Sequence, residues 1–299
     1  MEDTLEAARN PFLVSIARTP DEELAARAQS GDREALELLL TRLQLWIFNL
    51  ALRMMRLHAD AEDATQEILI RAMKALPGFR GDSKFTTWLY RIAANHLINV
   101  KKATWKVSDA VCSFERAAEG LRQVPDFDPP DPSTVPVPVE VLIEETRNHC
   151  TIGTLLCLDG RQRLVFVLGE VFGVSDQVGA EIVEVSPENF RQILSRARRD
   201  LYEYLRGNCS LVNPDSHCKC ARKTCAYMMA GFVDAQKLVF TQGHLRSVSD
   251  VAGRHADELM EAYLEAGARV YRNHPLYEPA AQAAMLRRVL DAVPLLKVP

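Results

Sequence analysis

Residues 60–102 read DAEDATQEILIRAMKALPGFRGDSKFTTWLYRIAANHLINVKK, and this stretch decides the fold. Apolar residues recur at helical spacing from Ala64 to Ala75, and Asp60 stands where it can cap this helix. Pro77 and the glycine after it end the helix, because proline cannot continue it. A short polar loop then leads to a second helix that begins at Phe85 and runs to about residue 102. The stretch therefore predicts two consecutive helices joined by a polar loop.

The same helical period extends outward in both directions. It covers residues 21–106, returns over 141–207 and is seen again from 226 to 296, whereas strand-like alternation is essentially absent. Between residues 107 and 140 the period fails, and six prolines mixed with aspartate and serine predict an extended linker. We therefore predict an all-α chain with a tail (1–20), a first helical domain (21–106), a linker (107–140), a second helical domain (141–207) and a helical C-terminal extension (208–299).

The formal net charge of −4 averages over segments of opposite sign. Residues 71–106 hold eight lysines and arginines against one acid, Asp82, whereas residues 109–145 hold nine acids against Arg116 and Arg122. A basic segment of this strength indicates a polyanionic partner, and the acidic, proline-rich segment is typical of a spacer. Local charge therefore permits nucleic-acid binding that the net charge alone would not suggest.

The sequence carries no pattern that indicates export. Its first 19 residues lack the basic start, apolar middle and small-residue cleavage site of a signal peptide, and no apolar run approaches the roughly 20 residues that span a bilayer. Seven cysteines, an odd number, argue against a disulfide framework. We expect a cytoplasmic protein whose cysteines are free thiols or metal ligands.

Residues 175–199 have the pattern of a helix-turn-helix. Ser175 is placed to cap a short helix, Glu184 and Val185 to make the turn, and Ser186 followed by proline to start the next helix. In that second helix an apolar stripe stands opposite a polar set suited to the major groove, namely Arg191, Gln192, Ser195, Arg196 and Arg199. The alternative is an ordinary amphipathic helix whose arginines face solvent.

A second candidate surface lies on the helix that starts at Phe85. Trp88, Arg91, Asn95, Asn99 and Lys102 follow one another at spacings of three or four, so they share one helix face. An aromatic, amide and cationic face suits single-stranded or opening DNA, because unstacked bases need aromatic platforms and phosphates need cations. Plain core packing is the alternative for Trp88.

These segments resemble a known family. DAEDATQEI at 60–68 and FRGDSKFTTWLYRIAAN at 79–95 resemble region 2 of extracytoplasmic-function (ECF) sigma factors of bacterial RNA polymerase. GRQRLVF at 160–166, FGVS at 172–175 and SRARR at 195–199 resemble region 4 of the same family. The motifs stand in the family order with a linker between them. The resemblance implies a sigma factor, which is not an enzyme, requires no cofactor, and binds core RNA polymerase and promoter DNA.

The resemblance also assigns roles to residues. It implies polymerase docking, through the β′ clamp, for a set on the first helix of the stretch: Asp60, Asp63, Gln66 and Glu67. It implies recognition and melting of the −10 element for a set on the loop and second helix: Arg80, Lys84, Trp88, Arg91, Asn95, Asn99 and Lys102. The −35 element would be read by Arg191, Gln192, Ser195, Arg196 and Arg199. The β subunit and an anti-sigma factor are further partners that the family implies.

Four positions depart from the family pattern. Asn99 stands where aspartate is usual, and Gly179 stands where a large aliphatic residue is usual. Glu184 occupies a turn position that often holds glycine, and Ile193 a position that is often basic. The glycine costs about 1 kcal/mol in a helix relative to alanine. These departures leave the fold and the general role in place and put the −35 sequence in doubt.

A cysteine cluster is the most unusual feature of the extension. Cys209, Cys218, Cys220 and Cys225 fall within seventeen residues. Tetrahedral zinc takes four nitrogen or sulfur ligands, so this set is a candidate site for zinc or another thiophilic metal. Cys225 is preferred over His217 as the fourth ligand, because His217 cannot share a metal with its neighbour Cys218 without strain. Redox-active thiols and incidental cysteines are the alternatives.

Three further expectations concern the same region. Arg222 and Lys223 should lower the pKa of the nearby thiols. Cys150, beside His149, is a subsidiary ligand candidate. The helical stripes of the extension need a partner for their apolar face, and we interpret the extension as an in-chain regulator.

Two competing functions remain open from the sequence. The first is a stand-alone regulator that uses only the helix-turn-helix; the block at residues 60–102 argues against it, because a simple repressor needs no strand-opening face. The second is a metal or redox sensor whose sigma-like part is degenerate, and Gly179 and Asn99 are its only support. No phosphate-binding loop or nucleophile–base pair indicates an enzyme.

Overall fold

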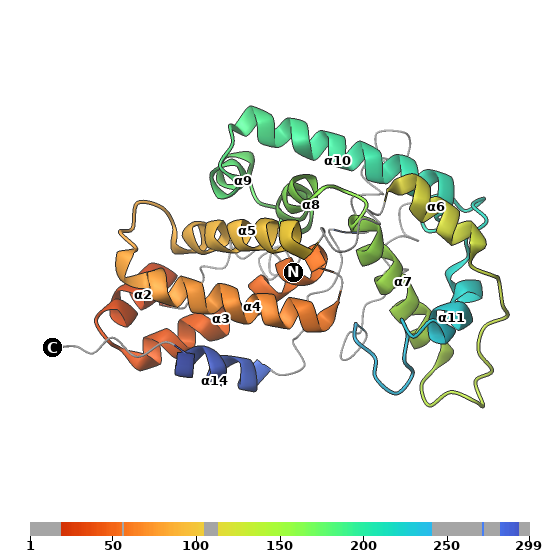
Figure 1. Cartoon of the computed structure of the whole chain (residues 1–299), viewed down its shortest axis with the longest axis horizontal. Helices are drawn as coiled ribbons and strands as arrows, with labels where there is room; N and C mark the ends of the chain where they lie inside the picture. Colours follow the sequence, from red (N-terminus) through yellow and green to blue (C-terminus); the bar gives the residue numbers. More distant parts are fainter. Residues whose placement is uncertain (1–18, 56, 105–112, 241–270, 272–281, 293–299) are drawn as a thin grey trace. The chain divides into compact units, whose positions relative to one another are not determined.

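The computed structural model describes residues 19–55, 57–104, 113–240, 271 and 282–292. All regular secondary structure in these residues is helical (Figure 1), which confirms the predicted all-α fold. The chain divides into two compact units. The first unit takes Met1–Val107, Val167–Arg191 and Leu276–Pro299, and the second takes Ser108–Phe166 and Gln192–Pro275.

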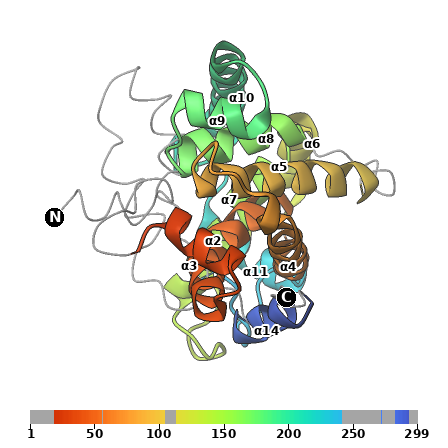
Figure 2. The ribbon, with the colours of Figure 1, turned by 90° about the vertical axis from the view of Figure 1, so that its left-hand side faces the viewer.

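The first unit is built on four helices from the N-terminal third of the chain. They are α2 (Asp21–Gln29), α3 (Arg33–Met55), α4 (His58–Ala75) and α5 (Phe85–Thr104), and Figure 2 shows α2 and α3 from their end of the molecule. α3 packs against both α2 and α4. Its buried side is mostly apolar, with residues such as Leu39, Ile47 and Leu50 each 0% exposed. These helices confirm the two-helix reading of residues 60–102.

α3 is long and apolar enough to cross a bilayer by length and composition alone, which the sequence reading did not anticipate. However, 67% of its most apolar window is buried against the rest of the fold. The helix also carries the buried Asn49 and Arg53, joined by a hydrogen bond of 2.9 Å from Arg53 Nη1 to Asn49 Oδ1. Burial of this kind is what the core helix of a folded domain requires.

Contacts from α2 position the loop between α4 and α5. Gln29 donates from Nε2 to the carbonyls of Leu76 (2.8 Å) and Phe79 (2.9 Å), where α4 ends in the 3₁₀ turn Leu76–Gly78. Glu22 accepts from the backbone N–H of Phe85 at 3.1 Å, so its carboxylate caps the N-terminus of α5. These bonds fix both ends of the loop that precedes the candidate DNA face.

The start of α4 differs from the prediction. The helix begins at His58 with Leu57 at the cap position, so Asp60 lies in the first turn and does not cap it. A carboxylate in the first turn still favours the positive end of the helix dipole. The predicted cap was wrong by about one turn because Asp60 is the only capping-type residue near this start, and Leu57 supplies no side-chain cap.

The first unit is completed by segments from later in the chain. They are the π-helical turn η2 (Val167–Val171), α9 (Asp176–Val183), the first turn of α10 (Pro187–Asn208) and α14 (Gln282–Ala292). Phe172 packs edge-on against Trp46 and Tyr90, with ring centroids 5.7 and 6.1 Å apart. α9 packs against α5, and α14 packs against α4 and α3. Met285 and Val289 make the buried side of α14.

The second unit contains a helix inside the predicted linker. The helices that the structure describes in this unit are α6 (Phe114–Gln123), α7 (Val139–Leu155), α8 (Gly160–Phe166), α11 (Cys220–Met229) and most of α10. The prediction of an extended segment over residues 107–140 was wrong for α6. Ser113 caps it through a 3.2 Å bond from the Arg116 N–H, and Ala118 and Leu121 form its buried side. All six prolines lie after α6, and they concealed its short helical period.

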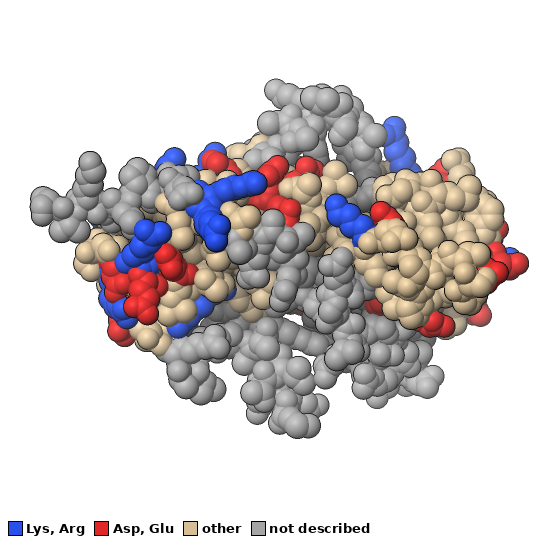
Figure 3. All heavy atoms as spheres, turned by 90° about the horizontal axis from the view of Figure 1, so that it is seen from below, with Lys and Arg blue, Asp and Glu red and all other residues tan. Residues whose placement is uncertain are grey.

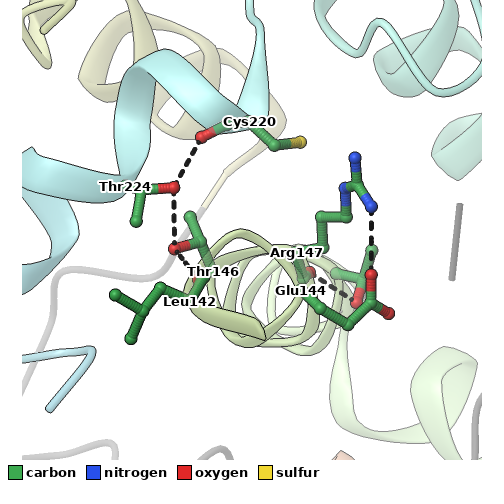
Figure 4. A network of polar contacts seen from close by, with 7 residues as sticks. Leu142, Glu144, Thr146, Arg147, Cys220 and Thr224 are labelled. Carbon is green, nitrogen blue, oxygen red and sulfur yellow. Dashed lines mark hydrogen bonds and ion pairs between the residues drawn. The ribbon is translucent and has the colours of Figure 1, made fainter. Parts of the chain in front are cut away.

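The second unit holds the start of the extension against α7. Thr146 on α7 and Thr224 on α11 share a hydrogen bond of 3.3 Å between their hydroxyls, and Thr224 also donates to the Cys220 carbonyl (Figure 4). Glu145 accepts from the backbone N–H groups of Val239 (2.6 Å) and Phe240 (3.0 Å). Residues 230–240 are therefore ordered without being helical, contrary to the predicted helix from 226 onward. The later stripes of that prediction, over 241–270, lie outside the described residues.

Candidate nucleic-acid and polymerase interfaces

The loop and first turn of α5 form an aromatic cluster. The ring of Trp88 lies 5.2 Å from those of Phe79 and Phe85, measured between centroids. Phe85 is buried, whereas Trp88 is half-buried. The Trp88 ring therefore packs in this cluster while the residue remains partly accessible to solvent. Tyr90, two residues further along α5, is fully buried.

The polar side chains of the α5 face differ in how free they are. Asn95 and Asn99 are exposed, as are Arg80 and Lys84 in the loop. Arg91 is engaged: its Nη2 lies 2.8 Å from Oε1 of Glu181 on α9. Sequence reasoning missed Glu181, because the two residues are 90 positions apart. The side chain of Lys102 lies outside the described residues.

A hollow of about 430 Å³ opens beside this face, lined by Arg71, Ile92, Asn95, His96 and Asn99. His96 is a further residue that sequence reasoning did not single out. Its pKa is lowered by burial and by the nearby Arg71 guanidinium, with Glu67 opposing the shift. The imidazole is thus held neutral, and it presents a neutral polar ring with two amides around the hollow.

The polymerase-docking candidates lie along α4. Asp60 and Asp63 are exposed, whereas Gln66 and Glu67 are half-buried. Glu67 accepts from Arg71 Nε at 2.6 Å, one turn further along the helix. The opposite side of α4 is buried through residues such as Ala61, Ile68 and Ala72. The helix therefore presents an acidic end and a mixed polar side.

The helix-turn-helix forms as its capping residues predict. Ser175 accepts from the Val178 N–H at 3.5 Å at the start of α9, and Ser186 accepts from the Asn189 N–H at 3.2 Å at the start of α10. Glu184 makes the turn in a left-handed conformation, with φ of 56°. The family often has glycine here, and the backbone geometry explains why.

The unusual Gly179 has a steric reason. A Cβ atom built on Gly179 would lie 2.4 Å from Cζ of Phe190, which is fully buried. The Phe190 ring on α10 thus occupies the space that an aliphatic side chain on α9 would fill. Gly179 and Phe190 form a matched pair, so the core of the helix-turn-helix is not left empty.

α10 separates an apolar from a polar side along its first turns. Ile193, Leu194 and Ala197 are buried, so Ile193 belongs to the core and does not replace a basic contact on the surface. The five predicted −35 residues, Arg191, Gln192, Ser195, Arg196 and Arg199, are all exposed. Arg191 makes ion pairs with Asp176 (3.3 Å) and Glu188 (3.4 Å), and Arg199 makes one with Asp200 (3.3 Å).

Acids and bases are interspersed elsewhere on the surface too. Arg27 pairs with Asp32 at 2.7 Å and Arg33 with Glu37 at 2.9 Å on α2 and α3. In the view of Figure 3, basic and acidic side chains lie side by side at the left of the molecule. Charged side chains of both signs are therefore interspersed on this part of the surface.

The four clustered cysteines of the extension are partly or fully buried. Cys218 is buried, whereas Cys209, Cys220 and Cys225 are half-buried and none is in a disulfide. Burial raises the pKa of Cys209, Cys218 and Cys220, and that of Cys218 rises to about 12. The prediction that Arg222 and Lys223 lower the pKa of these thiols was wrong in its net direction. Lys223 instead pairs with Asp126 at 3.0 Å and donates to the Val124 carbonyl.

Comparisons with known proteins support the resemblance to sigma factors. The family model of sigma-70 region 2 matches residues 39–107. The RNA polymerase sigma-H factor of Pseudomonas aeruginosa is 30% identical over 186 residues, which cover 61% of this chain and 92% of that protein. The ECF RNA polymerase sigma-E factors of Escherichia coli and Salmonella typhimurium are each 30% identical over 184 residues, 60% of this chain and 90% of the relative.

The aligned length and the helical architecture fit together. Nearly the whole of each relative is matched, and the matched family model spans α4 and α5 with their aromatic loop. Sigma factors of this kind are initiation factors without catalysis of their own, and they need no cofactor. The chain belongs to the extracytoplasmic-function (ECF) family of sigma factors, which bind core RNA polymerase and direct promoter-specific transcription initiation.

Proposed function

We propose a division of labour among three surfaces of this sigma factor. Region 2 (residues 21–106) docks on polymerase and opens the −10 element, region 4 (141–207) reads the −35 element, and the extension (208–299) restrains docking. Residues 107–140 connect the two regions. The observation that carries the proposal is the exposure of all five predicted −35 residues opposite a buried apolar stripe on one helix.

The −35 assignment rests on α10. Arg191, Gln192, Ser195, Arg196 and Arg199 combine guanidinium, amide and hydroxyl donors, which are the groups that read guanine and adenine edges in the major groove. Arg196 forms no ion pair with the residues that the structure describes. We assign it the principal base contact, and Arg191 and Arg199 phosphate contacts that replace their present carboxylate partners.

The −10 assignment rests on α5. Trp88 offers a partly exposed ring held rigidly by Phe79 and Phe85, so an unstacked base can lie on it without further ordering of the tryptophan. Asn95 and Asn99 border the 430 Å³ hollow and can donate to and accept from the edge of an extruded base. Arg80, Lys84, Arg91 and Lys102 supply the cations for the phosphates.

Docking on the β′ clamp is assigned to Asp60, Asp63, Gln66 and Glu67 of α4. α14 packs on this same helix and on α3, with Met285 and Val289 buried. A helix from the extension that lies on the docking helix is placed to compete with polymerase, and this supports an inhibitory role of the extension. The β subunit and a separate anti-sigma factor remain further proposed partners, and a stand-alone regulator is not favoured.

Run-off transcription with core polymerase tests the main proposal. The full chain should direct initiation from a subset of promoters in a genomic library, and Arg196→Ala should lose transcripts that Arg206→Ala keeps. Arg206 is the matched control, because it is exposed on the same helix outside the predicted set. Equal losses in both variants would contradict the −35 assignment.

A second pair of variants tests the extension. Val289→Asp places a charge on the buried side of α14 and should release it from α4, whereas Arg287→Ala changes an exposed residue of the same helix. We expect Val289→Asp to bind core polymerase more tightly than the unaltered chain, and Arg287→Ala to bind it equally. Unchanged or weaker binding of Val289→Asp, in a protein with unchanged helix content, would overturn the inhibitory role.

A further inference from the structure

A buried lysine of the extension joins α11 to the segment that follows α6. Lys223 is 5% exposed, and its ammonium group donates to the carbonyl of Val124 and lies 3.0 Å from the carboxylate of Asp126. The bond from Lys223 holds the pKa of Asp126 below its ordinary value. A lysine is rarely buried to this extent unless its charge is paired. The place of Lys223 in the fold therefore depends on a segment 99 positions earlier in the chain.

Two further bonds join α11 to the backbone of the same segment. The N–H of Phe127 donates to the carbonyl of Arg222 at 2.9 Å, and the thiol of Cys225 donates to the carbonyl of Asp128 at 3.3 Å. Bonds to backbone groups fix the course of the chain itself, not only the position of one side chain. Residues 105–138 lie between α5 and α7, and we call them the connector. The extension therefore holds the connector at residues 124–128.

The extension is in turn attached to α7, at two places. Thr224, next to Lys223 on α11, is 0% exposed, and its hydroxyl lies 3.3 Å from that of Thr146 on α7 (Figure 4). Further along the extension, the N–H groups of Val239 and Phe240 donate to Glu145 of α7 at 2.6 and 3.0 Å. α11 thus joins the connector to the first helix of region 4 through bonds on both of its sides.

This attachment shortens the reach of the connector. Its 34 residues, 105–138, could span up to about 120 Å between α5 and α7 if nothing held them. With α6 helical and residues 124–128 held, the chain from α5 to the attachment spans at most about 55 Å. The −10 and −35 elements lie about 25 base pairs apart, which is roughly 85 Å along B-form DNA. The attachment therefore changes the reach of the connector on the same scale as the separation of the two elements.

We propose that Lys223 is a positioning residue that sets which spacing between the −10 and −35 elements this sigma factor accepts, because it fastens the connector to α11 and thereby to α7. The proposal rests on the assignment of the −10 element to region 2 and of the −35 element to region 4. Release of residues 124–128 lengthens the chain between α5 and its attachment to α7 from 19 to 34 residues. The effective concentration of one region at its element falls roughly as the −3/2 power of connector length, so it should drop about two- to threefold at the preferred spacing and depend less on spacing.

Transcription from promoters that differ only in spacer length tests this role. Lys223→Met keeps an apolar stem and removes the ammonium group, and Arg222→Met is the matched control, because that exposed neighbour bonds to Phe127 through its backbone carbonyl alone. The series is built on the promoter that the full chain uses best. The ratio of transcription at the best spacing to that at a spacer two base pairs longer should be about two- to threefold smaller for Lys223→Met and unchanged for Arg222→Met. A merely structural lysine would scale transcription equally at all spacings, so equal ratios in the three proteins would overturn the proposal.

Hydrogen exchange at the Phe127 amide measures the attachment without transcription. The amide should exchange slowly in the full chain and in Arg222→Met, and faster in Lys223→Met. Asp126→Asn removes only the ion pair and keeps the Lys223 bond to Val124, so its exchange rate should be intermediate. Fast exchange in the full chain would rule out the attachment. Slow exchange in a chain that starts no transcript at any spacing would show the attachment while overturning the promoter assignment, and the spacing role with it.

Discussion

The two candidate DNA surfaces, on α5 and on α10, come from similar sequence patterns and are built differently. On α10 the polar set is wholly exposed and the apolar stripe beneath it is separate. On α5 the same kind of spacing yields a face in which Trp88 belongs to an aromatic cluster and Arg91 is tied to Glu181. The polar set on α10 thus lies at the surface, where Arg191 and Arg199 make ion pairs, whereas Trp88 on the α5 face is also part of the packing of the fold.

This difference suits the two tasks that we propose for these surfaces. A recognition helix inserts into an intact duplex and needs freely presented donors. A strand-opening face must hold extruded bases in fixed positions, and a ring already locked by packing loses little further freedom when a base stacks on it. The comparison predicts that substitutions on α5 affect stability and DNA opening together, while those on α10 affect binding alone.

Trp88→Ala should give the largest change. Removing the ring from between Phe79 and Phe85 should lower the free energy of unfolding by about 2–4 kcal/mol, somewhat less than for a fully buried tryptophan. Asn95→Ala, on the exposed part of the same face, should stay within about 0.5 kcal/mol. Urea denaturation followed by circular dichroism measures both, and a small effect of Trp88→Ala would erase the distinction between the two surfaces.

Gly179→Ala tests the packing between α9 and the start of α10, beneath the exposed polar set. The added Cβ meets the Phe190 ring, so we expect a loss of about 1–3 kcal/mol in stability. Gly120→Ala on α6 is the matched control, because nothing lies within 4 Å of its Cβ position and alanine should stabilise that helix by up to about 1 kcal/mol. The two substitutions should shift the thermal midpoint in opposite directions; a gain from both would show that Phe190 moves aside freely.

Arg196→Ala should weaken binding to −35 DNA by about 1–3 kcal/mol while leaving stability unchanged. Fluorescence anisotropy of polymerase holoenzyme on labelled promoter fragments measures the affinity, with Arg206→Ala as the control. A loss that is uniform across −35 sequences would move Arg196 from base reading to a phosphate contact.

The smallest expected effect concerns pH and the α5 side. The pKa of His96 is lowered in the folded chain by burial and by Arg71. Its unfolded pKa is about 6.5, so the unfolded chain binds more protons below that pH and the stability from neutral His96 is lost as the pH falls. Between pH 7 and 5, His96→Gln should lose stability less steeply than the unaltered chain. His217→Gln, which changes an exposed histidine, is the control. If stability falls equally with pH in the unaltered chain, His96→Gln and His217→Gln, burial of neutral His96 does not contribute to the pH dependence.

The sequence predicted the features that arise from neighbouring residues. Ser175 and Ser186 were identified as caps because a cap and its helix are adjacent. The features it missed join distant residues: Glu22 caps Phe85 across 63 positions and Glu181 holds Arg91 across 90. α6 was missed because prolines beyond it dominated the local composition.

The ion pairs of the arginines that we propose to contact DNA have a consequence for the energetics of association. Arg91, Arg191 and Arg199 already hold carboxylates of their own chain, at 2.8 to 3.4 Å. When phosphate displaces such an internal acid, the freed acid takes up its own hydration and counterions, which offsets part of the gain from ions released by the DNA. The affinity of this protein for DNA should therefore fall less steeply with salt concentration than its number of basic contacts implies. Its non-specific binding to genomic DNA should also be weak.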